Sequence, residues 1–113
     1  MIPYQDDFSC WEEVQGAYNM SDPEPEKVFL ATYKYEDYSG SSDVFYYDKG
    51  KYYWVSGGHC SCYGLEGQWE PTEYDNVDEL LNAIGKYWRD FSHLEAELHS
   101  YPPKPIQKTP LEI

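Results

Sequence analysis

Residues 43–56 have the sequence DVFYYDKGKYYWVS, which decides the fold. Two runs of mostly aromatic and β-branched residues, Asp43–Tyr47 and Lys51–Ser56, flank the short segment Asp48–Gly50. Such runs favour strands, and Gly50 can adopt the positive φ that a tight turn requires. The stretch therefore predicts a β-hairpin.

A third strand is predicted upstream, over Lys27–Tyr35. Side chains alternate between the two faces of a strand, so we expect two sets of residues on opposite faces. One set is Val28, Leu30 and Thr32, and the other is Phe29, Ala31, Tyr33 and Tyr35. The polar segment Glu36–Ser42 predicts a loop between this strand and the hairpin.

The residues after the hairpin are less regular. Four glycines within Gly57–Gln68 predict irregular structure there. Trp69–Tyr74 suits a short strand, but Pro71 lacks the N–H that a sheet ladder needs, so this strand belongs at an edge.

The strongest helical pattern lies in the C-terminal third. Asn76 and Glu79 have the spacing of a capping box, which marks a helix start. Apolar residues then recur at helical intervals and predict a buried stripe. The stripe consists of Val77, Leu81, Ile84, Trp88 and Phe91. A second helix can begin at Ser92 and reach about Ser100, and one bent helix is the alternative.

A shorter helix is expected near the N-terminus. Ser9 and Glu12 form a capping-box pattern, so we expect a helix over Cys10–Gln15 that ends at Gly16. The two prolines within Ser21–Glu26 predict a linker, since proline interrupts both helices and sheet ladders.

These elements predict an α+β domain over residues 1–101. We expect an antiparallel sheet of three to four strands, with the C-terminal helix, or two helices, packed on one face. The other face is expected to present Tyr and acidic side chains to water. Residues 102–113 contain four prolines and predict an extended tail.

The chain is strongly acidic: its formal net charge is −13, from 21 acidic and 8 basic residues. Such a surface repels phosphate, so direct binding to nucleic acid or to an anionic membrane is not expected. A partner with a basic surface would be attracted instead. The alternative is that the charge serves only solubility.

The sequence has neither a long apolar run nor a signal-like N-terminus, so we expect a cytoplasmic protein that spans no membrane. In that compartment its three cysteines would stay reduced.

A metal or thiol site is the second functional hypothesis, centred on His59, Cys60 and Cys62. Cys10 is a possible fourth ligand. The Cys-x-Cys spacing is tighter than zinc sites usually have, and no second ligand pair follows. The acidic field would also raise the pKa of a thiol. We therefore expect no metal, no cofactor and no catalytic activity.

The run Gly57–Pro71, GGHCSCYGLEGQWEP, resembles segments of small uncharacterised phage and prophage proteins. The resemblance extends back to about Tyr38 and carries no known activity. The resemblance implies a phage product in the host cytoplasm. Small acidic phage proteins often resemble inhibitors of the host's nucleic-acid-binding proteins, and this implies such a role here. A structural or assembly component of a phage particle is a third hypothesis.

The leading hypothesis is thus an acidic inhibitor that imitates nucleic acid. On one strand face, residues i and i+2 lie about 7 Å apart, close to the phosphate spacing of a nucleic-acid strand. We expect carboxylates to line one edge of the sheet and aromatic residues in nearby loops to select the partner. The expected carboxylates are Glu36, Asp37, Asp43 and Asp48, and the expected aromatic residues are Tyr38, Tyr63 and Trp69.

Overall fold

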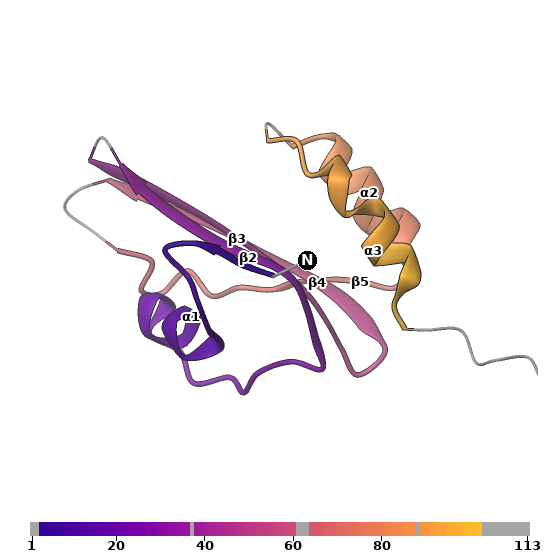
Figure 1. The fold of residues 1–113 in the computed structure, drawn as a ribbon, viewed down its shortest axis with the longest axis horizontal. Coiled ribbons are helices and arrows are strands. Elements are labelled where there is room, and N and C mark those ends of the chain that lie inside the picture. Colours follow the sequence, from indigo (N-terminus) through magenta and orange to yellow (C-terminus); the bar gives the residue numbers. More distant parts are fainter. Residues whose placement is uncertain (1–2, 37, 61–63, 88, 103–113) are drawn as a thin grey trace, which may run out of the picture.

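The computed structural model describes residues 3–36, 38–60, 64–87 and 89–102. They form a sheet with strand order β1-β2-β3-β4-β5, covered by α1 on one face and by α2 and α3 on the other (Figure 1). The strands are β1 (Tyr4–Asp6), β2 (Lys27–Glu36), β3 (Ser39–Asp48), β4 (Lys51–Cys60) and β5 (Thr72–Tyr74). The helices are α1 (Trp11–Tyr18), α2 (Val77–Gly85), the 3₁₀ turn η1 (Ser92–Leu94) and α3 (Glu95–Ser100).

The α+β class is confirmed, but the sheet has five strands instead of three or four. The strand missing from the prediction is β1, which pairs in parallel with β2 and makes the sheet mixed. Its register sets Tyr4 opposite Ala31 and Asp6 opposite Tyr33. Three residues are too few to show the alternation that identifies a strand in a sequence.

The hairpin of β3 and β4 is confirmed and is longer than predicted. Lys49 and Gly50 form its turn with φ values of 52° and 86°, the positive pair that a two-residue hairpin turn requires. Pairing continues as far as Ser39 opposite Cys60. Gly57–Cys60 are therefore strand, and the prediction of irregular structure there was wrong.

Strand β2 contains a bulge that overturns its predicted alternation. The register shifts between Val28 and Leu30, so Phe29 and Leu30 both pack with the α2–α3 layer. Val28 and Ala31 both pack with α1 instead. A bulge inserts one residue into one strand and thereby changes which face the following residues occupy.

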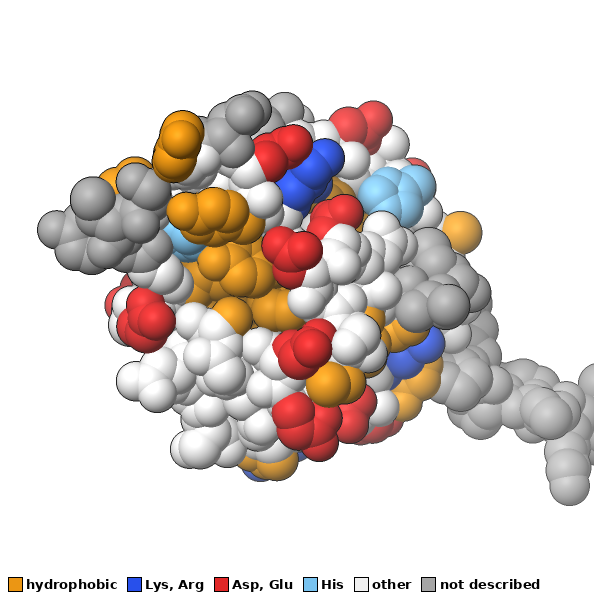
Figure 2. Space-filling view, turned by 60° about the vertical axis from the view of Figure 1, so that its left-hand side comes forward, with side chains coloured by type: hydrophobic (Ala, Val, Ile, Leu, Met, Phe, Trp, Pro, Cys, Tyr) orange, Lys and Arg blue, Asp and Glu red, His pale blue; other side chains and the backbone are white. Residues whose placement is uncertain are grey.

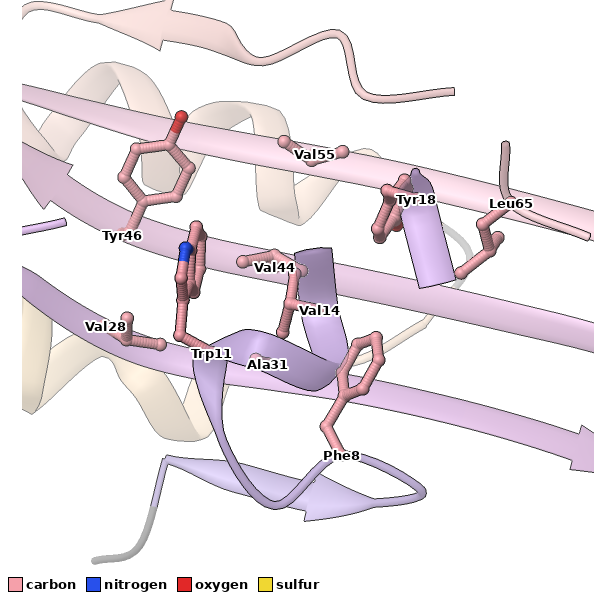
Figure 3. Close-up of a cluster of buried hydrophobic side chains, with 10 residues drawn as sticks. All are labelled: Phe8, Trp11, Val14, Tyr18, Val28, Ala31, Val44, Tyr46, Val55 and Leu65. Carbon is pink, nitrogen blue, oxygen red and sulfur yellow. The ribbon is translucent and has the colours of Figure 1, made fainter. Parts of the chain in front are cut away.

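Both faces of the sheet are buried, so the expected solvent-facing side was wrong. Trp11, Val14 and Tyr18 of α1 pack on one face, and this cluster is drawn in Figure 3. The remaining buried members are Phe8, Val28, Ala31, Val44, Tyr46, Val55 and Leu65. Buried residues from β2–β4 and the C-terminal helices form a second cluster. They are Phe29, Leu30, Phe45, Tyr47, Tyr52, Leu80, Ile84, Phe91, Leu94 and Leu98.

Helix α1 passes through Gly16, where the sequence predicted its end. It stops at Asn19, whose φ of 53° is left-handed, after Tyr18 has donated a 2.8 Å hydrogen bond to Ser42 Oγ. At its start, the Glu13 carboxylate accepts from the Ser9 N–H and hydroxyl, one residue later than the Glu12 partner we expected.

Helix α2 starts as predicted: the Glu79 N–H donates to Asn76 Oδ1 at 2.9 Å. It ends at Gly85, and the predicted second helix forms as η1 and α3, so the alternative of one bent helix was wrong. Beyond the helix, Tyr87 and Arg89 reach the sheet, where Tyr87 bonds Ser56 and Arg89 pairs with Asp43.

The predicted stripe is only partly buried. Ile84 is buried, Val77 and Leu81 are partly buried, and Phe91 is buried but follows the helix instead of belonging to it. Trp88 lies outside the described residues, as does the predicted tail from residue 103 onward.

Strand β5 begins after Pro71, so the edge strand expected from Trp69 forms only in its second half. Among residues 3–36, 38–60, 64–87 and 89–102, no helix has the length and apolar character to cross a bilayer.

Candidate protein-interaction surface

The layer of residues 3–26 is uniformly acidic. It comprises β1, α1 and the linker to β2, and it contains no Lys or Arg. Its acidic residues are all exposed: Asp6, Asp7, Glu12, Glu13, Asp22, Glu24 and Glu26. The α2–α3 layer is mixed, because Lys86 and Arg89 accompany its acids. The charge is therefore more uniform over residues 3–26 than over the α2–α3 layer.

Hydrophobic side chains are also visible at the surface. The face in Figure 2 carries a hydrophobic area with Asp and Glu side chains around it. The large hydrophobic residues that are exposed include Tyr35 and Tyr38, at 46% and 79%. Hydrophobic and acidic side chains thus lie close together on this face, as a selective protein contact would need.

The predicted acidic edge does not form. Glu36 ends β2 and Tyr38 follows it, whereas Asp48 lies at the far end of β3. A strand of ten residues separates its ends by about 30 Å. Asp37 and Tyr63 lie outside the described residues.

Asp43 is buried, and its expected place on an exposed edge was wrong. Its side chain is 0% exposed and accepts hydrogen bonds from Trp54 Nε1 at 2.9 Å and Arg89 Nη1 at 3.4 Å. Burial raises the pKa of the Asp43 carboxyl, and the bond from Trp54 and the charge of Arg89 oppose that rise. Asp43 anchors the segment after α2 to the sheet and cannot reach a partner.

Two other predicted residues, Asp48 and Trp69, lie on one cleft. Its volume is about 240 Å³, and its walls come from α1, the linker, the end of β3 and the segment before β5. The lining residues are Trp11, Asp22, Pro23, Pro25, Tyr46, Asp48, Lys49 and Trp69. We call this the Trp11–Trp69 cleft.

The linker anchors this cleft. Trp11 Nε1 donates to the Asp22 carbonyl at 2.8 Å, and Trp69 Nε1 donates to Asp22 Oδ2 at 2.9 Å. Gln15 Nε2 also donates to the Asp22 carbonyl, at 2.9 Å. Trp11, Asp22 and Tyr46 were not among the predicted site residues. Trp11 has no distinguishing pattern beyond its helical spacing from Val14, and Tyr46 resembles an ordinary strand residue.

His59 lies in an aromatic cluster with Tyr33 and Tyr35. Tyr33 Oη lies 2.6 Å from His59 Nε2, and His59 Nδ1 lies 2.7 Å from the Cys60 carbonyl oxygen. Because a carbonyl only accepts, Nδ1 donates to it, and when the ring is neutral the Tyr33 hydroxyl donates to Nε2. The ring crosses Gly40, the residue opposite His59, where a side chain would collide with it.

This arrangement bears on the metal hypothesis. Both ring nitrogens of His59 have a partner, and Cys62 lies outside the described residues. Within the described part of the chain, no three His, Cys, Asp or Glu side chains gather as metal ligands would. A metal-dependent or thiol-dependent module therefore stays a prediction without support from the geometry.

Two hollows on the α2–α3 side border Tyr87. One, of about 410 Å³, is lined by Trp54, Ser56, Glu70 and Tyr87 among others. The Ser56 hydroxyl lies 2.8 Å from the Tyr87 hydroxyl. A phenol is a poor general base, so Tyr87 by itself would not activate Ser56 as a nucleophile.

Comparison with family models, with curated proteins and with solved structures finds no match to this chain.

Proposed function

We propose that this chain is an acidic protein-binding protein whose partner has a basic surface that normally binds nucleic acid. The observation that carries the proposal is the layer of residues 3–26, which has exposed acids and no Lys or Arg. A surface of one sign accelerates association with a surface of the opposite sign and rejects like-charged partners.

The proposed action is inhibition by nucleic-acid mimicry. Carboxylates of residues 3–26 occupy the positions of phosphates, and exposed aromatic residues such as Tyr35 and Tyr38 give the contact its selectivity. The resemblance of Gly57–Pro71 to phage proteins suggests a host protein as the target. Binding takes place in the cytoplasm of that host and requires neither a cofactor nor catalysis.

The test is capture from bacterial lysate, followed by affinity measurements with the captured protein. We expect binding to weaken steeply between about 50 and 500 mM salt, since exposed charges are screened over shorter distances as salt increases. DNA or RNA should compete for the partner. Equal affinity at both salt concentrations, without competition by nucleic acid, would leave solubility as the role of the charge.

Charge reversals locate the surface. Asp7→Lys with Glu12→Lys should slow association by roughly tenfold or more, because both acids belong to the uniform layer. Glu70→Lys with Glu95→Lys changes the net charge equally, and these acids line the two hollows that border Tyr87. A similar loss in both pairs would mean that overall charge, and not the α1 layer, attracts the partner.

A further inference from the structure

Three aromatic rings form one corner of the Trp11–Trp69 cleft. The rings of Tyr46 and Trp69 are nearly parallel, with centroids 6.0 Å apart and an interplanar angle of 4°. Trp11 stands across both, at 77° to Tyr46 and 78° to Trp69. Figure 3 shows Trp11 of α1 beside Tyr46 of β3. Aromatic faces carry partial negative charge and attract cations.

Two carboxylates add full negative charge to the same cleft. Asp22 and Asp48 both line it, from the linker and from the end of β3. Burial, reinforced by the charges of Asp22 and Asp48 among others, raises the pKa of Tyr46. The negative potential of these carboxylates therefore reaches the ring that lines the cleft, and the interior disfavours anions.

The walls are held in place before any ligand arrives. Both indole N–H groups are bonded to Asp22, so neither Trp ring has to be ordered on binding. A preorganised site avoids the entropic cost of fixing side chains. The cleft has a volume of about 240 Å³, which is ample for a planar cationic head group.

We propose that the Trp11–Trp69 cleft binds the guanidinium group of an arginine side chain on the basic partner. Guanidinium stacks on aromatic faces and pairs with carboxylates through a planar fork of donors, whereas a lysine ammonium is a more strongly hydrated point charge. The inference rests on the proposed function, because it names the group of the partner that enters this cleft.

The cleft also contains one positive charge. Lys49 lies in the turn between β3 and β4 and is exposed. Its ammonium competes with an incoming cation for the same carboxylates. Removing this charge with Lys49→Gln should tighten binding of a guanidinium by roughly twofold to fivefold.

The test uses the free protein and the small probe N-acetyl-arginine amide. Its readout is the pair of indole N–H resonances of Trp11 and Trp69 in ¹H–¹⁵N spectra. We expect saturable shifts with a Kd of about 1 mM, typical of one charge-assisted contact in a preformed site. N-acetyl-citrulline amide has nearly the same shape without the charge, and it should bind at least tenfold more weakly.

Variants connect the binding to the two carboxylates. Asp48→Asn should weaken the affinity for the arginine probe by about fivefold to tenfold. Asp22→Asn should do the same, and its amide oxygen can still accept from Trp69. Asp78→Asn makes the same charge change at an exposed position of α2, away from the cleft, and should leave the affinity for the probe unchanged. Unchanged melting temperatures of these variants establish that the fold is intact.

Several results would overturn the inference. Equal binding of the citrulline probe would show that charge is not recognised. Full affinity in Asp48→Asn would place the probe elsewhere. Tighter binding of choline than of the arginine probe would indicate a small quaternary ammonium ligand instead of a protein side chain. If the arginine probe does not bind but capture of the partner depends on salt, only this inference is refuted. If the probe binds but no basic partner is captured, the proposed function is refuted instead.

Discussion

Replacing Asp43 with Ala should strongly destabilise the protein. The side chain is fully buried and joins β3 to the segment after α2 through Arg89. The substitution leaves the Trp54 indole N–H and the Arg89 guanidinium without this acceptor. A buried ion pair adds little net stability, but removal of one partner alone is costly because the other stays desolvated.

The magnitude follows from these two bonds. Each hydrogen bond to a charged group contributes about 1.5–3 kcal/mol. The Trp54 bond is short at 2.9 Å, whereas the Arg89 bond is long at 3.4 Å and the Arg89 side chain is 26% exposed. Water therefore compensates part of the Arg89 loss, and we expect a total of about 3 kcal/mol.

Urea denaturation followed by tryptophan fluorescence measures this loss as a change in the free energy of unfolding. The matched control is Glu70→Ala, which removes the same charge from an exposed position and should change stability by less than about 0.5 kcal/mol. If Asp43→Ala also stays within about 0.5 kcal/mol of the parent, the buried network does not hold the C-terminal segment on the sheet.

Two further predictions concern pH and packing. Burial raises the pKa of the Asp43 carboxyl, so the folded protein retains a proton there that the unfolded chain releases. The stability of the parent relative to Asp43→Asn should therefore fall as the pH rises from about 4 through the raised pKa. A constant difference in unfolding free energy between pH 4 and 8 would contradict this. Gly40→Ala should cost about 1–3 kcal/mol, since a Cβ there meets the His59 ring and lies 3.0 Å from Tyr33 Cε1. In Gly58→Ala the nearest atom is 3.5 Å away, so this control should unfold at a higher urea concentration than Gly40→Ala, and the reverse order would show that His59 moves aside freely.

Local chemistry made part of the fold predictable. The hairpin followed from its turn, where Lys49 and Gly50 both have positive φ, and the start of α2 followed from Asn76 and Glu79. These features depend on residues within a few positions of one another. The bulge at Phe29 and the short strand β1 depend on partners far along the chain, so no local pattern revealed them.

The sequence indicated only in part that α1 covers the second face of the sheet. Trp11, Val14 and Tyr18 have the spacing of a buried helical face, but Gly16 was interpreted as the end of the helix. Gly16 is exposed, and no atom lies within 4 Å of where its Cβ would be. A glycine on the outer side of a helix lowers its stability without ending it when burial of the inner side compensates.

The candidate site was harder to predict, because residues that are close in the sequence do not lie close together in the fold. Glu36, Asp43 and Asp48 lie within thirteen residues in the chain, yet two of them mark opposite strand ends and the third points into the core. Asp48 and Trp69 meet because β4 returns the chain along β3 and the next segment brings Trp69 against α1 and Tyr46. That meeting requires the complete topology.

The Trp11–Trp69 cleft shares its walls with the core, and this limits which substitutions can test it. Trp11 and Tyr46 are 4% and 8% exposed, so truncating either ring removes core packing at a cost of several kcal/mol. Loss of binding in such a variant would report unfolding as readily as a missing contact. Asp22 and Asp48 are more accessible and lie outside the packed clusters. The rings therefore fix the shape of the cleft, because the fold needs them, and the proposal assigns its affinity for a cation to the two carboxylates, although Asp22 also holds the Trp69 indole.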